Sequence, residues 1–269
     1  MYPFFELFPD SSFSIIIYTF GLWLLVSFFA FFAMLKKLSS KYSYDISIFV
    51  NNILWYFISV FFFSRLFYVI SKWNDLKYIN NPAEFFIMSD YNFSLFWAMF
   101  WFFIVFLINL KLRKEKIEKY IDWLVLSFLF ILIIGFIWAF FGWQVYWKET
   151  NFWIELMYNH PFTPIPYQSP IFPLAIMYSV LFFIEFSVLY MLSMFIKIRW
   201  FIGYTGLLVF SIIIIIGESF SGKYDIFKVS IWFSFSQILA VILIIYSFYK
   251  LYYISKISSK DTTVLTPKH

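Results

Sequence analysis

The chain alternates between long hydrophobic runs and shorter polar segments. An α-helix needs about 20 mostly apolar residues to cross the hydrocarbon core of a bilayer, and seven of the runs have roughly this length. The pattern therefore predicts an all-α, polytopic integral membrane protein with about seven transmembrane helices. The predicted spans are residues 13–35, 48–70, 93–110, 123–143, 171–196, 201–217 and 230–253.

Basic charge also alternates along the chain. With the N-terminus outside, the inner segments hold 14 of the 20 Lys and Arg residues and the outer segments hold 5. Cytoplasmic segments are the ones enriched in Lys and Arg, so we predict N-terminus out and C-terminus in. Lys36 and Lys37, rather than a small-residue cleavage site, follow the first span, so we expect it to stay in the protein.

The domain organisation follows from these spans. We predict a single membrane domain over residues 1–258 and a polar cytoplasmic tail over residues 259–269. Residues 148–170 contain four prolines, which are incompatible with a regular helix. We expect this segment to be a structured extracytoplasmic loop.

Composition narrows the class of protein. The 269 residues are 63% apolar and 13% charged, with a mean hydropathy of +0.82. A soluble domain has about 25% charged residues, so a soluble globular domain, a disordered chain and a nucleic-acid binder are excluded. Cysteine is absent, and His160 and His269 do not converge with other ligands. We therefore expect no disulfide, no metal site and no cofactor.

Charged residues inside membrane spans are costly and point to function. Arg65 lies near the outer end of the second span and Glu218 at the outer end of the sixth, which suggests a polar pocket that opens outward. The alternative is a buried Arg–Glu pair, or side chains that reach the interface. Asp122 lies at the inner boundary of the fourth span. Glu185, in the middle of the fifth, has no assigned partner, and a protonated carboxyl hydrogen-bonded to a neighbouring helix is one interpretation.

One segment resembles a known family. Residues 135–150 read GFIWAFFGWQVYWKET and are similar to the signature region of the prolipoprotein diacylglyceryl transferases. The glycine, tyrosine and lysine of that signature correspond to Gly135, Tyr146 and Lys148. The acidic residue that opens the same span in the family corresponds to Asp122.

Other segments resemble the family in the same order along the chain. Residues 64–69, SRLFYV, are similar to its G-R-I/L-x-Y-V motif and include Arg65. Ser94 keeps the serine of a serine–histidine motif, Glu218 falls on the glutamate of Y-G-x-x-R-x-x-x-E, and Gln237 falls on the glutamine of S-M-G-Q-I/L-L. The resemblance extends from about residue 10 to residue 255.

The resemblance implies an enzyme of lipoprotein biosynthesis on the outer face of the plasma membrane of a bacterium. Such a transferase moves diacylglyceryl from phosphatidylglycerol to the lipobox cysteine of a prolipoprotein signal peptide, with membrane lipid around it. This chemistry needs a cation for the phosphate and a thiolate that the substrate supplies. The implied substrate-binding candidates are Arg65, Ser94, Asp122, Gln144, Tyr146, Glu218 and Gln237.

The chain differs from the family at the positions of several residues that the resemblance would make catalytic. The family's histidine corresponds to Phe96, two of its arginines correspond to Phe136 and Ile214, and a glutamate corresponds to Gln144. Phenylalanine and isoleucine cannot bind phosphate or move a proton. If transfer is retained, Arg65 has to bind the phosphate, with Lys148 or Lys223 at the rim.

Tryptophan replaces glycine at seven positions of the resemblance, although glycine is used where helices or ligands approach closely. Divergence, with tryptophans as interfacial anchors, is one explanation. We hypothesise instead that the gene reads UGA as glycine and that translation has rendered it as tryptophan. The seven tryptophans at glycine positions are Trp97, Trp101, Trp138, Trp143, Trp147, Trp200 and Trp232.

Two other functional classes stay open. A non-catalytic relative that binds lipid or lipoprotein segments is favoured by the lost His and Arg positions. A transporter or channel would need a polar path through the midplane or inverted repeats, and the sequence has neither.

Overall fold

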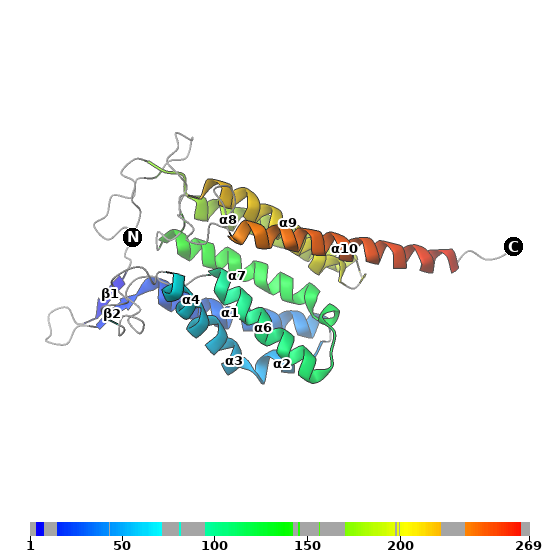
Figure 1. Ribbon diagram of the computed structural model, residues 1–269, viewed down its shortest axis with the longest axis horizontal. Coiled ribbons are helices and arrows are strands. Elements are labelled where there is room, and N and C mark those ends of the chain that lie inside the picture. Colours follow the sequence, from blue (N-terminus) through cyan, green and yellow to red (C-terminus); the bar gives the residue numbers. More distant parts are fainter. Residues whose placement is uncertain are drawn as a thin grey trace.

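A computed structural model describes residues 4–7, 15–42, 44–71, 81, 95–141, 145, 156, 170–196, 198, 200–221 and 235–264. This part of the chain is predominantly helical, with one short hairpin near the N-terminus (Figure 1). In the hairpin, strands β1 (Phe4–Leu7) and β2 (Ile15–Tyr18) pair in antiparallel register, with Phe4 opposite Tyr18.

The first helix begins later than the hydrophobic pattern predicted. Helix α1 runs over Thr19–Tyr42, whereas the predicted span began at residue 13. Residues Ile15–Tyr18 are apolar and β-branched or aromatic, and they pair with β1, so their backbone groups bond across the hairpin instead of along a helix. The helix then continues past the basic pair that was expected to end the span.

The second predicted span is a broken helix. It consists of α2 (Ser47–Val50), α3 (Ile53–Ile58), the π-helix η1 (Ser59–Phe63) and α4 (Ser64–Ser71). A π-helical turn inserts an extra residue into the helical repeat and is frequent at functional sites. Hydropathy does not report such an interruption, because an average over a window does not depend on which backbone hydrogen bonds form.

The remaining helices form antiparallel hairpins. Helix α6 (Leu95–Arg113) connects through the 3₁₀ turn η3 (Ile117–Lys119) to α7 (Ile121–Phe141). Helices α8 (Leu174–Phe195), α9 (Phe201–Phe220) and α10 (Phe235–Val264) follow. Helix α10 continues to Val264, beyond the start of the segment predicted as a polar tail.

Four helical segments in the described part of the chain are long and apolar enough to cross a membrane. They are Ile121–Phe141, Leu174–Phe195, Phe201–Phe220 and Ser236–Lys256, which correspond to the fourth to seventh predicted spans. The fold is therefore that of a helical protein compatible with a membrane.

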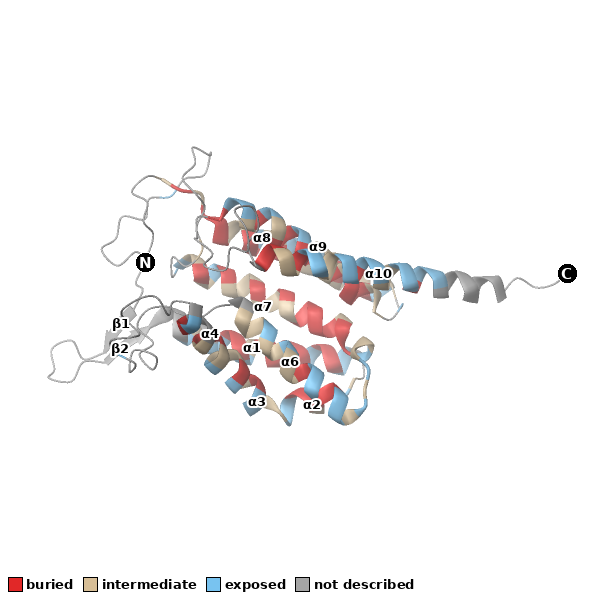
Figure 2. Ribbon diagram, viewed as in Figure 1, coloured by how far each residue is buried: buried red, intermediate tan, exposed pale blue. Residues whose placement is uncertain are grey.

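Helix α7 is the centre of the bundle. It packs against α1 on one side and against α8 and α9 on the other, α10 packs on α9, and α6 packs against η1 and α4 (Figure 1). Trp123, Leu126 and Leu129 of α7 are fully buried. Figure 2 shows buried residues along the helix faces that meet at α7 and exposed residues on α10. The hydrophobic outer faces of the helices are suited to lipid rather than water.

Candidate functional site

Gln237 and Ser219 make the polar contact between α9 and α10 at the end of the bundle nearest the β-hairpin, which we call the hairpin end. The buried Gln237 donates from Nε2 to Ser219 Oγ at 3.1 Å and to the Ile215 carbonyl at 3.4 Å. Ser219 Oγ donates to the same carbonyl at 2.8 Å. The half-buried Glu218 adjoins this contact in sequence. The structure thus brings together two of the residues singled out in the sequence, Glu218 and Gln237, on neighbouring helices.

Tyr178 of α8 lies beside the same end of α9. Its ring and hydroxyl rest against Gly217, where an added Cβ atom would overlap them. The hydroxyl oxygen is buried and makes no hydrogen bond to any described residue. Only a residue without a side chain can stand at position 217 with this tyrosine in place.

Arg65 lies on the other side of α7, in α4. Its side chain is only 4% exposed, and it follows the π-helix η1 by two residues. Helix α4 packs mainly against η1 and α6. The broken second span therefore places a buried arginine beside α6.

Apolar side chains fill the positions where the family resemblance would require arginines. Phe136 of α7 is buried, with ring centroids 4.7 Å from Tyr178 and 5.6 Å from Phe182. Ile214 is buried on α9. Phe210, also on α9, extends the stack, 5.7 Å from Phe182. We call Phe136, Tyr178, Phe182 and Phe210 the aromatic stack; it supplies no charge for an anion.

Asp122 contacts the start of α9, whereas Glu218 lies near the end of that helix. The Asp122 carboxylate accepts hydrogen bonds from the backbone N–H groups of Trp200 at 2.8 Å and Gly203 at 2.7 Å, at the start of α9. Glu218 is fifteen residues further along α9 than Gly203, or roughly 22 Å at 1.5 Å per residue. Asp122 instead caps α9 from a neighbouring helix, satisfying donors that a helix start leaves unpaired.

Several of the candidate positions lie outside the described residues. These are Ser94, Gln144 and Tyr146, together with Trp143, Trp147 and Trp232. Phe96 lies within α6. Among the described tryptophans, Trp138 stacks on Trp23 with ring centroids 3.4 Å apart, and Trp200 has a positive φ of 72°.

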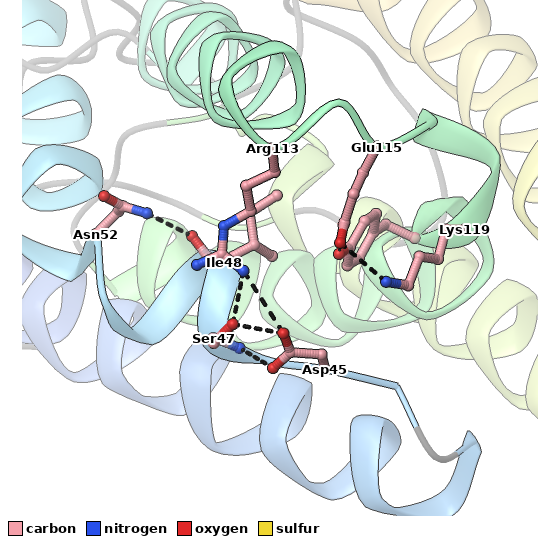
Figure 3. Close-up of polar contacts among 8 residues, drawn as sticks. Asp45, Ser47, Ile48, Asn52, Arg113, Glu115 and Lys119 are labelled. Carbon is pink, nitrogen blue, oxygen red and sulfur yellow. Dashed lines mark hydrogen bonds and ion pairs between the residues drawn. The ribbon is translucent and has the colours of Figure 1, made fainter.

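The opposite end of the bundle, which we call the basic end, carries a polar network that the sequence analysis did not identify (Figure 3). Arg113, at the end of α6, donates from Nη1 to Ser47 Oγ at 2.6 Å and lies 3.5 Å from Asp45 Oδ2. Hydrogen bonds from the Ser47 hydroxyl and amide, with Arg113 nearby, hold the pKa of Asp45 below its usual value. The network fixes the start of the second helical segment to the end of α6.

Two further carboxylates stabilise this end. Burial alone would raise the pKa of Glu115, but hydrogen bonds from Tyr120 and Lys119 outweigh it and lower the pKa. Lys250 donates to Glu118 at 2.9 Å and connects α10 to the turn before α7. No signal in the sequence pairs Glu118 with Lys250, because they are more than a hundred residues apart.

No group of three or more His, Cys, Asp or Glu residues within the described ranges is arranged to hold a metal ion. Models of known protein families were compared with the sequence and none matches. No curated protein matches the sequence either.

Proposed function

We propose that the chain spans the plasma membrane of a bacterium seven times, with the N-terminus outside and the C-terminus inside. The four membrane-length helices support this, as do α1 and α6, which are 24 and 19 residues long. The alternation of basic charge supports the orientation. Lysines at the ends of α1 and α6 and on the C-terminal half of α10 share the basic end.

We propose further that the protein transfers diacylglyceryl from phosphatidylglycerol to the lipobox cysteine of prolipoprotein signal peptides at the outer face. The observation that carries this proposal is the burial of Arg65 directly after a π-helix, at the end of the bundle assigned to the outer leaflet. A guanidinium group can bind two phosphate oxygens at once, so a lipid phosphate of the outer leaflet is an anion that suits this side chain.

The chemistry assigns Arg65 a phosphate-binding role. The substrate thiolate attacks the glyceryl carbon, a carbon–sulfur bond forms, and the carbon–oxygen bond to the phosphate breaks. Glycerol phosphate leaves with the electron pair, and its charge develops beside the guanidinium group. A fixed cation lowers the barrier because it stabilises that charge without reorganisation, and the guanidinium can bind two phosphate oxygens at once.

The aromatic stack favours a second function, a non-catalytic relative that binds lipid or lipoprotein segments. The positions expected to carry arginines are occupied by Phe136 and Ile214, and both are buried in apolar packing. Apolar groups of this kind suit acyl chains or an apolar signal peptide, but they cannot stabilise a leaving phosphate.

A transfer assay tests the proposal and separates the two functions. The protein is purified from its own host, mixed with phosphatidylglycerol and a lipobox peptide, and the mass of the peptide is followed. We expect a diacylglyceryl-sized gain. We expect Arg65→Leu to reduce the rate by about 10²-fold or more, and Arg65→Lys to retain part of it.

The matched control is Arg113→Leu, which removes an arginine from the basic end and should leave transfer unchanged. Unchanged turnover in Arg65→Leu would exclude the phosphate-binding role. No mass gain, together with retained binding of phosphatidylglycerol, would replace the transferase by the lipid-binding function.

A further inference from the structure

Glu185 is a buried carboxyl in the middle of α8 that neither proposed function uses. Its side chain is 5% exposed, and it occupies the twelfth of the 22 positions of a helix of membrane-spanning length. Both carboxyl oxygens are inaccessible, and neither makes a hydrogen bond to any described residue. Nearly all buried polar side chains in proteins have a partner, so this exception needs a physical explanation.

The carboxyl lies at the junction of three helices. Oε1 is 3.9 Å from the point where a Cβ atom at Gly206 of α9 would stand, and the same point is 2.7 Å from Val125 Cγ1 of α7 and 3.0 Å from Leu189 Cδ1 of α8. The backbone N–H of Phe210 acts on the carboxyl electrostatically but does not meet hydrogen-bond geometry. The carboxyl and these two aliphatic groups therefore gather around the same bare backbone position, Gly206.

Charges on the neighbouring elements do not favour an ionised Glu185. Helices α7, α8 and α9 contain no Lys, Arg or His, and their other acids are Asp122 and Glu218. The Asp122 carboxylate accepts hydrogen bonds from the N-terminus of α9, and Glu218 lies near the other end of that helix. Among the described contacts of α8, Lys41 of α1 lies over the Tyr190 ring at 4.2 Å, more than one helical turn beyond Glu185.

We propose that Glu185 is a proton-binding site at the midplane, and that the bound proton is what allows α8 to pack against α9. As a neutral carboxylic acid, Glu185 fits a junction made of Gly206, Val125 and Leu189. As a carboxylate without a cation, it would be an uncompensated charge in an apolar core. Loss of the proton would therefore weaken the α8–α9 contact. The proposal is independent of the transferase function and needs only the three helices.

The test compares thermal unfolding of the full-length protein and Glu185→Gln in detergent over a range of pH. Glutamine has the shape of the neutral acid and cannot ionise. The folded wild type holds a proton that the unfolded chain releases, so its stability falls as the pH rises. We expect equal melting temperatures in acid and a wild type that becomes progressively less stable than Glu185→Gln toward alkaline pH.

Glu118→Gln is the matched control and should behave in the opposite way. Burial opposes ionisation of Glu118, but the hydrogen bond from Lys250 outweighs it and lowers its pKa. The ionised Glu118 therefore stabilises the folded protein near neutral pH, and this stabilisation is lost as the pH falls through the lowered pKa. This variant should be less stable than wild type at neutral pH and match it in acid. A melting-temperature difference between wild type and Glu185→Gln that does not change with pH would overturn the proposal.

A hydrophobic carbodiimide gives a second measurement that needs no folded variant. The O–H group of a protonated carboxylic acid adds across a C=N bond of dicyclohexylcarbodiimide, and the acyl group then shifts to nitrogen, so all atoms of both reactants stay in the adduct. We expect the adduct on the peptide that contains Glu185. Labelling should fall about tenfold per pH unit once the acid ionises. Labelling of that peptide that is independent of pH would contradict a titrating site.

Discussion

At the residue scale, Trp200 has an unusual backbone conformation, which among the described non-glycine residues it shares with Lys114. Trp200 precedes α9 with φ of 72° and ψ of −14°, in the left-handed region. That conformation costs an L-residue roughly 1–2 kcal/mol and costs glycine almost nothing. Trp200 is also one of the seven tryptophans that occupy glycine positions in the family resemblance, and Asp122 holds its amide in place. Two unrelated considerations, motif spacing and φ, thus favour glycine at this position.

We predict that Trp200→Gly is more stable than Trp200→Ala by about 1 kcal/mol, because both variants lose the ring but only glycine relieves the positive φ. Thermal unfolding of the two variants measures the difference. Mass spectrometry of the peptide from the native host would also determine which residue the host inserts. Equal stability of the glycine and alanine variants would remove the conformational argument. UGG codons at the seven positions would refute the coding hypothesis.

At the element scale, small residues on α9 determine how the helices pack. Gly203 brings α9 against the backbone of Ile121 at the start of α7, and Gly206 brings it against Val125. Close approach of backbones at glycines is a common way for membrane helices to associate, since lipid provides no hydrophobic force between them. The same approach lets Asp122 reach the first amides of α9.

We predict that Gly203→Ala destabilises the protein by about 1–3 kcal/mol, whereas Gly135→Ala does not. A Cβ at position 203 would lie 2.8 Å from the Ile121 carbonyl carbon, which cannot move without separating α7 from α9. No described atom lies within 4 Å of a Cβ at position 135, where alanine gains helix propensity over glycine. Melting temperatures of the two variants test this pair. A Gly203→Ala protein as stable as wild type would show that α9 is free to shift.

At the scale of the whole molecule, the two ends of the bundle differ in chemistry. The basic end is organised by ion pairs such as Lys250–Glu118 and by the Arg113–Ser47 contact. The hairpin end has the aromatic stack, the Gln237–Ser219 contact and the buried Arg65. Under the proposed orientation, the basic end would face the cytoplasm, in keeping with the enrichment of Lys and Arg on that side of membrane proteins.

The orientation can be tested directly because the chain contains no cysteine. Lys114 and Asn81 are both exposed and lie on segments predicted to face opposite sides of the membrane. In intact cells, we expect an impermeant thiol reagent to label Asn81→Cys and to leave Lys114→Cys unlabelled until the cells are opened. The reverse pattern would mean that the N-terminus lies inside.

The sequence predicted membrane-length helices at α7 to α10, because hydrophobic length is a local property of the chain, although α10 extends past its predicted end. It also identified Arg65, Glu218 and Gln237 as unusual residues. The structure was needed to show that Ile15–Tyr18 is a strand, because a short apolar run reads equally well as part of a helix or as a strand. It also placed Asp122 against the N-terminus of α9 and Glu185 against Gly206. Contacts between distant segments depend on how helices cross, and a hydrophobic pattern records which residues are apolar but not which neighbours they meet.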